Sequence, residues 1–302
     1  MNDGSVAPAR GIGALQQIPA PALVVAGTLS IQFGAALAAT IFDEAGAAGT
    51  TLLRLLLGSL IVMIFWKPRI RSRPAAHLRL TVLFGVTLAA MNLCVYEAID
   101  RIPLGIVVTV EFIGPISVAA ALSRRRADFI WIVLAVAGIL LLTRPWGQDT
   151  GLDTIGLVLA VVAAAAWAGY ILLAQRVGRF FDGGEGLILA MIVASAVTFI
   201  PGVVDGGSAL VRPEVLAVGV GIALLSSAIP FSLETEALRR MSARVFGVLM
   251  SVEPAIAALA GFLVLSQKLD AGDIGAIALV VIASVGVTRS APAPRSEAAI
   301  EA

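Results

Sequence analysis

Residues 109–119 read TVEFIGPISVA, and this stretch places a glutamate, Glu111, in a segment that is otherwise as apolar as lipid. A proline, Pro115, follows four residues later. A second apolar stretch, LMSVEPAIA, places Glu253 directly before Pro254. An ionisable group and a helix-breaking residue therefore occur together in two apolar segments, and the nature of these segments decides what the acids do.

The composition indicates a membrane protein. Of the 302 residues, 59% are hydrophobic and 14% are charged, and the mean hydropathy is +0.98. A soluble domain needs more polar surface than this. Many apolar runs approach the roughly 20 residues that a helix needs to cross a bilayer. They lack the alternation of barrel strands, and helices satisfy their own backbone hydrogen bonds in lipid. We therefore expect an all-α polytopic membrane protein.

Ten candidate transmembrane helices are separated mostly by turn-forming or charged segments such as KPRIRSRPAAH and VDGGSALVRP. The first tail, residues 1–19, lacks the apolar core and cleavage site of a signal peptide. This tail and the last one, residues 290–302, are expected to be disordered. The ten helices are expected at residues 20–41, 48–66, 78–99, 102–122, 127–143, 154–174, 186–203, 214–235, 244–265 and 271–289.

The basic residues predict how the chain is oriented. If the loops alternate between the two sides, sixteen of the 21 lysines and arginines fall on the side that holds both termini. The other side holds four, and Arg54 lies inside a span. Cytoplasmic loops carry the excess of Lys and Arg, so both termini are expected in the cytoplasm. The four on the outer side are Arg101, Arg144, Arg212 and Lys268.

An internal repeat links the two halves of the chain. A shift of 139 residues places Glu97 on Glu236 and Pro115 on Pro254. Each repeat, 20–143 and 154–289, holds five spans, so the second is expected to be inverted in the membrane relative to the first. Inverted repeats are common in secondary transporters, whose substrate sites lie near the midplane at the junction of the repeats. Chance similarity between Ala-rich helices is the alternative.

Glu111 and Glu253 each lie nine residues into their spans, roughly 13 Å from opposite membrane edges. The two carboxyl groups are therefore expected to converge on the midplane. A charge at that depth costs about 2.5–3.5 kcal/mol, so each acid is protonated, paired with a cation or exposed to a wet cavity. Arg54 is the candidate partner. Either an Arg54–Glu111 pair only joins two helices, or at least one glutamate serves the transport path.

Three prolines are expected to break helices near the acids. Pro115 has no N–H to donate to the carbonyl of Glu111, and Pro254 leaves the carbonyl of Met250 without a helical partner. Pro230 has the same effect in the eighth span, beside Ser226, although a packing kink explains it equally well. Broken helices near the midplane hold polar substrates in transporters.

Other polar and aromatic residues within the spans either line a polar cavity or join helices by hydrogen bonds. Glu234 and Glu236 lie near the cytoplasmic end of the eighth span and are expected to be solvated or paired with the arginines that follow. The candidate cavity residues are Gln32, Asn92, Tyr96, Trp167 and Tyr170.

Several absences narrow the function. One cysteine, Cys94, excludes an intrachain disulfide, and a single histidine, His77, effectively excludes a zinc site built on His and Cys. The chain has no P-loop, H-E-x-x-H or G-x-S-x-G motif. We therefore expect neither an enzyme nor a cofactor, metal or nucleic acid, and any transport must use the gradient of an ion or a substrate.

The paired motifs E-x-x-x-P and S-V-E-P-A-x-A-A-L, in two five-span repeats, resemble the EamA type of the drug/metabolite transporter superfamily. Segments such as WAGYILLAQRVG, PFSLETEALRRM and FGVLMSVEPAIAAL are similar to the bacterial threonine/homoserine exporters. The resemblance covers about residues 20–289. It implies an inner-membrane carrier, driven by the proton gradient, that exports small amino acids. One departure is Ser266-Gln267, where the family usually has Gly-Glu, and this weakens any role for a carboxylate at that loop.

These observations together predict a proton-coupled exporter of threonine, homoserine or similar neutral amino acids. Glu111 or Glu253 would bind the substrate ammonium or the coupling proton, and Arg54 would meet the substrate carboxylate or tune Glu111. Export of another metabolite or a drug is one alternative, and a membrane scaffold or sensor without transport is another. The oligomeric state stays open, with a homodimer as one option.

Overall fold

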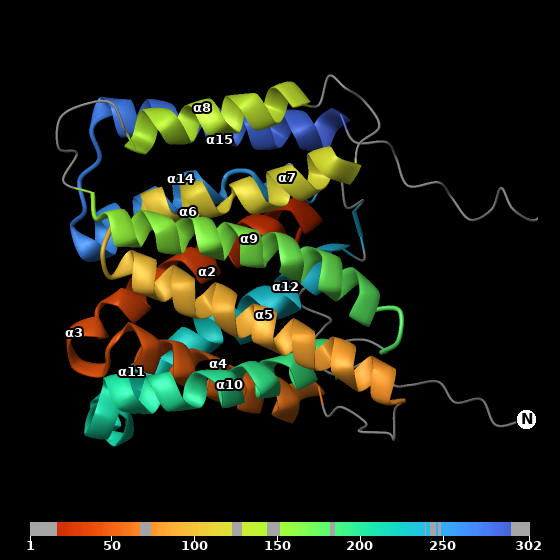
Figure 1. Ribbon diagram of the computed structural model, residues 1–302, viewed down its shortest axis with the longest axis vertical. Helices are drawn as coiled ribbons and strands as arrows, with labels where there is room; N and C mark the ends of the chain where they lie inside the picture. The colour runs from red at the N-terminus through yellow and green to blue at the C-terminus, as the bar shows by residue number, and fades with distance from the viewer. Residues whose placement is uncertain are drawn as a thin grey trace, which may run out of the picture.

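The computed structural model describes residues 17–66, 74–122, 129–143, 152–181, 185–238, 240–241, 246 and 249–290. Every regular element in these ranges is a helix (Figure 1). Six helical segments are long and apolar enough to cross a membrane. They are α2 (Ala20–Ala39), α4 (Ala47–Trp66), α5 (Ala75–Ile99), α9 (Thr154–Val177), α10 (Glu185–Gly206) and the continuous run from α11 (Pro213–Ala223) through η3 (Leu224–Ala228) into α12 (Ile229–Leu238).

The remaining apolar helices are shorter. Helices α6 (Leu104–Glu111) and α7 (Ile113–Leu122) follow each other directly, and α8 (Phe129–Thr143), α14 (Glu253–Leu265) and α15 (Ala271–Ser290) are separate. Two small elements lie in turns, α3 (Phe42–Ala45) and η2 (Gly207–Val211).

Described helices occupy all ten ranges predicted from the sequence, and most of their ends agree to within a few residues. In the ninth range, 244–265, helix α14 begins at Glu253, and much of 242–248 lies outside the described residues. The two tails expected to be disordered lie almost entirely outside them too. Hydropathy fixed these positions well because an apolar run of bilayer length has few other folds available.

Two helical segments are interrupted near prolines. The segment from Leu104 to Leu122 divides at Phe112, three residues before Pro115. The run from α11 to α12 widens into a π-helical turn, η3, directly before Pro230. A proline inside a helix removes an N–H donor and crowds the preceding turn, and π turns are a common way to accommodate such a defect.

The turns gather at two ends of the bundle. At the first end, Arg212 forms an ion pair with Glu44 at 3.1 Å, which joins the α10–α11 connection to α3. At the same end, the side chain of Gln267 accepts a hydrogen bond from the backbone N–H of Leu104 at 3.0 Å. This contact joins the α14–α15 and α5–α6 connections.

The opposite end holds the other helix termini. His77, at the start of α5, stacks on Phe180, just after α9, with ring centroids 4.1 Å apart. Arg240, after α12, donates to the carbonyl of Ile18, just before α2, at 3.0 Å. The described helices therefore run alternately between the two ends, as the charge pattern predicts, and Arg212 and Lys268 both belong to the first end.

The most extensive packing joins helices that are distant in sequence: α5 with α9, α4 with α10, α8 with α15, α5 with α10, and α2 with α12. Figure 1 shows α8 and α15 side by side at one edge of the molecule, with α4, α10 and α11 at the opposite edge. Helices α2, α5, α6, α9, α12 and α14 lie between these edges, and they carry most of the candidate site residues.

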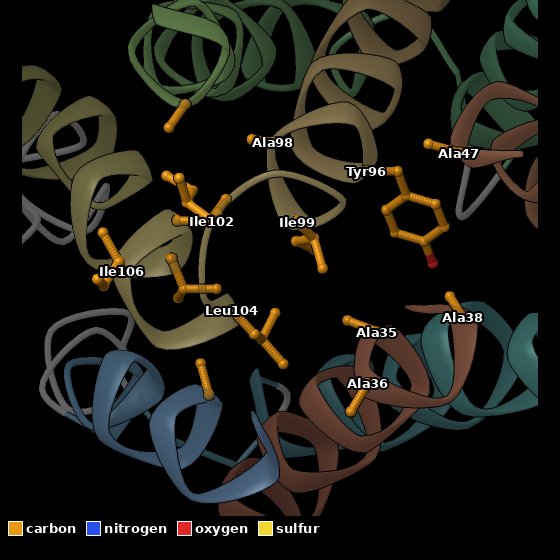
Figure 2. Packing of buried hydrophobic residues seen from close by; sticks show 14 of the residues in the cluster. Ala35, Ala36, Ala38, Ala47, Tyr96, Ala98, Ile99, Ile102, Leu104 and Ile106 are labelled. Carbon is orange, nitrogen blue, oxygen red and sulfur yellow. The ribbon is translucent and has the colours of Figure 1, made fainter. Parts of the chain in front are cut away.

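Small and branched apolar side chains fill the core toward the first end of the bundle. Figure 2 shows Ala35 and Ala36 of α2 facing Ile99 and Leu104, which flank the connection between α5 and α6. All four are buried. Alanine lets helix backbones approach closely, which is how helices pack in lipid.

Candidate functional site

Glu253 is the first residue of α14, and Val252 caps that helix. The side chain is 5% exposed, and its Oε1 accepts a hydrogen bond of 2.8 Å from Nε2 of Gln32 on α2. Gln32 is itself 3% exposed. The N-terminus of a helix favours a negative charge, so α14 and Gln32 both stabilise the carboxylate form of Glu253. Among the described residues, neither Glu253 Oε2 nor Gln32 Oε1 has a hydrogen-bond partner.

Arg54 of α4 lies against neutral groups. Its Nη1 donates to the hydroxyl of Tyr96 at 3.3 Å, and its guanidinium carbon lies 5.4 Å from the centroid of that ring. Tyr96 is completely buried and, in Figure 2, its hydroxyl points from α5 toward Ala38 of α2. A guanidinium over an aromatic face is stabilised by the ring quadrupole. Among the described residues, no anionic group contacts this partly buried cation directly.

The third contact of Arg54 is a backbone carbonyl that Pro230 leaves available. Nη2 of Arg54 donates to the carbonyl of Ser226 at 3.4 Å. Residue 230 would ordinarily donate its N–H to the carbonyl of residue 226 in an α-helix, or to that of residue 225 in a π-helix, and proline has no N–H. Ser30 of α2 donates to the carbonyl of Leu225 at 2.6 Å. The missing N–H of Pro230 frees one of these two carbonyls, and side chains of α4 and α2 donate to both.

Glu111 ends α6 and is 8% exposed. Its carboxyl group interacts electrostatically with Arg54 and with Glu253. Among the described residues, however, Arg54 and Glu111 form no direct ion pair or hydrogen bond. The sequence left open whether an Arg54–Glu111 ion pair only joins two helices. The described contacts contain no such ion pair.

Glu234 is a candidate that the sequence analysis did not select. It lies on α12, and its carboxyl group interacts electrostatically with Glu253 and with Tyr170. Its Oε1 is buried and lacks a hydrogen-bond partner among the described residues. A Cβ built on Gly27 of α2 would lie 3.6 Å from this oxygen. Oε1 of Glu234 therefore faces the bundle interior, which differs from the expectation of a solvated side chain, whereas Arg239, one of the two expected partners, lies outside the described residues.

Glu236 behaves as expected: it forms an ion pair of 2.8 Å with Arg240. The two acids differ because residues two apart lie on nearly opposite faces of a helix. A signal for Glu234 was present in the sequence, since Ser226, Pro230 and Glu234 are four residues apart. Residues at that spacing share a helix face.

The remaining candidates differ in how close they come to the acids. Trp167 of α9 meets Phe112, next to Glu111, edge to face at 5.3 Å. Tyr170 packs on Phe84 at 5.1 Å. Asn92 directs its Nδ2 to the carbonyl of Leu88 on its own helix, at 2.8 Å. One of the two N–H donors of its amide is thus used within α5.

Gln267 occupies the position where the resemblance leads us to expect a glutamate. Its amide oxygen caps the first turn of α6 through the N–H of Leu104. A helix N-terminus needs a hydrogen-bond acceptor, and an amide oxygen is one as much as a carboxylate is. The part of the chain that the structure describes holds no cluster of His, Cys, Asp or Glu suited to a metal ion.

These features define the class of protein: an all-helical, multi-pass membrane protein with buried acids and a partly buried arginine among its helices. Residues 154–289 match the model of the EamA-like transporter family. The threonine/homoserine exporter RhtA of Salmonella typhimurium is 45% identical over 262 residues, which cover 86% of this chain and 88% of that protein. RhtA of Escherichia coli K12 is 44% identical over 274 residues, 90% of this chain and 91% of that protein.

The chain belongs to the EamA-like transporter family, and it is not an enzyme. A solved crystal structure shares its fold, with a TM-score of 0.59 over 89% of this chain and 96% of that one. At 18% sequence identity, this similarity concerns the fold alone.

Proposed function

We propose that the chain exports threonine, homoserine or similar small neutral amino acids across a bacterial inner membrane, coupled to the proton gradient. The observation that carries this proposal is the set of charged groups among the helices: the partly buried Arg54, and the buried Glu111 and Glu253. A neutral amino acid carries one carboxylate and one ammonium group, and each finds a group of opposite charge here. The RhtA relatives, which are named as exporters of such amino acids, support the same cargo.

The architecture that we propose is ten transmembrane helices in two inverted repeats, residues 20–143 and 154–289. The packing pattern supports this symmetry. Exchanging each helix for its counterpart five spans away turns the α2–α12 pair into the α9–α5 pair, and both pairs pack extensively. The same exchange maps the α4–α10 and α8–α15 pairs onto themselves. A pseudo-two-fold axis would produce this pattern, and transporter sites lie on such axes near the midplane.

Each site residue has a proposed role. Arg54 would bind the substrate carboxylate, with Tyr96 and the Ser226 carbonyl holding its guanidinium. Glu253, oriented by Gln32, would bind the substrate ammonium or the coupling proton. Glu111 would exchange a proton, because burial without a direct cation favours the neutral form of a carboxyl group. Trp167, Tyr170 and Asn92 would line the path, and Pro115, Pro230 and Pro254 would keep the helices broken beside it.

The proposed function also implies which other molecules the chain contacts and how it lies in the membrane. The chain would contact membrane lipid along its exposed apolar faces and use protons as the coupling ion, with both termini in the cytoplasm. It would need no cofactor. A homodimer is compatible with a carrier whose site lies within one chain.

The test is transport by purified protein in liposomes loaded with labelled threonine or homoserine, with and without an imposed pH gradient. Glu111→Gln and Glu253→Gln each remove an ionisable group and keep the side-chain shape. We expect both variants to lose threonine export and its response to the pH gradient, while protein yield stays at the wild-type level. Glu97→Gln is the matched control, because Glu97 forms a half-exposed ion pair with Arg101 at 2.8 Å.

Normal export by both site variants would contradict the role of the acids. Transport of another solute but not of these amino acids would favour a drug or metabolite exporter. No transport of any solute by the wild-type protein would favour a scaffold or sensor.

A further inference from the structure

The buried charges near the site do not balance. Three carboxyl groups, from Glu111, Glu234 and Glu253, interact within the bundle, and Arg54 is the cation whose interaction with them is shown among the described residues. Arg54 acts on Glu111. Glu234 and Glu253 therefore share a region that lacks a compensating positive charge within the part of the chain described.

Unpartnered acceptors point to what this region binds. Oε1 of Glu234, Oε2 of Glu253 and Oε1 of Gln32 are all buried, and none has a hydrogen-bond partner among the described residues. Gln32 and Glu253 are each more than nine-tenths buried and hydrogen-bonded to each other, so their remaining oxygens belong to one place. Leaving such atoms unsatisfied costs stability, and a built site explains why the chain retains them.

We propose that Glu234, Glu253 and Gln32 form the subsite for the primary ammonium group of the transported amino acid, and that Arg54 alone serves the carboxylate. The proposal rests on the amino-acid export proposed above and adds Glu234 to it. An ammonium group has three N–H donors and no acceptor, so it matches a set of three oxygen acceptors with net negative charge. In the absence of substrate, protons neutralise the same carboxylates.

The positions of the helices are consistent with separate subsites for the ammonium and carboxylate groups. Gln32 and Gly27 lie on α2, and the Glu234 side chain packs against α2 at Gly27, where its Cγ would be in ordinary contact with an added Cβ at 3.4 Å. Glu234 lies on α12 and Glu253 on α14, and both of these helices pack on α2. Arg54, on α4, contacts the same run of helix as Glu234 two turns earlier, at Ser226. One substrate between the two sites would thus touch α2, α4, α12 and α14.

The proposal predicts which analogues the carrier binds. Threonine methyl ester keeps the ammonium group and lacks the negative charge, whereas 2,3-dihydroxybutanoate keeps the carboxylate and replaces the ammonium with a hydroxyl group. Inhibition of threonine exchange by each compound is measured in liposomes for the wild-type protein and for Glu234→Gln. We expect the ester to inhibit the wild type and the hydroxy acid to inhibit it weakly.

In Glu234→Gln, the ratio of the two inhibition constants should move by about tenfold or more toward the hydroxy acid, the size of one charge-assisted hydrogen bond. Glu236→Gln is the matched control: it changes the same helix two residues away, where the carboxylate pairs with Arg240. This control should keep the wild-type ratio. Should Glu234→Gln fail to reach the membrane, Glu234→Asp is measured instead, and it too should shift the ratio toward the hydroxy acid.

An unchanged ratio in the Glu234 variant would overturn the ammonium subsite while leaving threonine export intact. Absence of threonine exchange in the wild type would instead contradict the proposed function. The two failures are therefore distinguishable in one assay.

Discussion

At the scale of single residues, Ser266 at the end of α14 has a backbone conformation that is unfavourable for a residue with a side chain. Ser266 has φ 54° and ψ 24°, in the left-handed region, and it is the one described residue other than glycine with a positive φ. This conformation costs a residue with a side chain roughly 1–2 kcal/mol. Glycine adopts it freely, which fits the Gly-Glu that the resemblance leads us to expect at this loop.

Replacing Ser266 with glycine should therefore stabilise the protein. Part of the relieved strain is offset because glycine has more freedom in the unfolded chain, so we expect a net gain of about 0.5–1 kcal/mol. The measurement is the midpoint of thermal unfolding in detergent, which should rise by about 2 °C. Ser266→Ala keeps the Cβ and should show no gain. A gain of the same size in both variants would mean that backbone strain is not the cause.

For single residues, the sequence predicted depth in the membrane correctly, but it did not predict the direction in which the Glu234 side chain points. Glu111 and Glu253 lie in long apolar runs, so their burial followed from hydropathy, and the structure buries both. Glu234 lies near the end of a span, and distance along the helix axis suggested solvent. Whether the Glu234 side chain faces solvent or the bundle depends on how α12 is rotated about its axis. That rotation is set by packing against neighbouring helices such as α2, and hydropathy carries no information about this packing.

At the scale of helical elements, Pro230 does more than bend a span. Its missing N–H leaves one carbonyl of the π-helical turn η3 without a helical donor, and Arg54 and Ser30 donate to two carbonyls of this turn, so α4 and α2 are both attached to it. Gly34 allows this approach, because a Cβ at residue 34 would collide with Oγ of Ser226. The position of the Arg54 guanidinium thus depends on a backbone defect in another helix.

Pro230→Ala should separate stability from transport. The restored N–H can donate to the Ser226 or Leu225 carbonyl, which removes an acceptor from Arg54 or Ser30 and gives α12 a regular hydrogen bond. We expect unchanged or higher thermal stability, because proline inside a helix is unfavourable by about 3 kcal/mol. We also expect a fall in threonine export of about tenfold, the value of one hydrogen bond to a charged group. The measurements are thermal unfolding in detergent and efflux from liposomes.

Pro213→Ala provides the control for this experiment. Pro213 is the first residue of α11, where its missing N–H has no helical partner in any case. Export should be unaffected by that change. If Pro230→Ala exports as well as Pro213→Ala, the freed carbonyls have no part in holding Arg54.

Element boundaries were predictable because each apolar run ends in charges, glycine or proline. The form of the interruptions was not. Proline indicates that one hydrogen bond is missing, but it does not say whether the chain kinks or, as at 224–228, widens into a π turn. The outcome depends on donors supplied by other helices, here Ser30 and Arg54.

At the scale of the whole molecule, the orientation in the membrane is a prediction that a labelling experiment can test. Lys268 and Arg179 are both exposed; Lys268 precedes α15 and Arg179 follows α9, and these two helix ends lie at opposite ends of the bundle (Figure 1). In a Cys94→Ser background, Lys268→Cys should react with a membrane-impermeant maleimide added to intact cells. Arg179→Cys should react only after the cells are opened. The reverse pattern would place both termini outside and would contradict the charge rule.

The pairing of helices across the two halves has a consequence for biosynthesis. The most extensive contacts of α2, α4, α5 and α8 are with α12, α10, α9 and α15, so the early helices find their main partners only in the later part of the chain. The ribosome delivers the chain from its N-terminus, and the early helices must therefore wait for the later ones. A chain released after Thr143 would present unpaired Arg54 and Glu111 to the bilayer. Completion of synthesis, more than insertion, is the step that commits this protein to its native assembly.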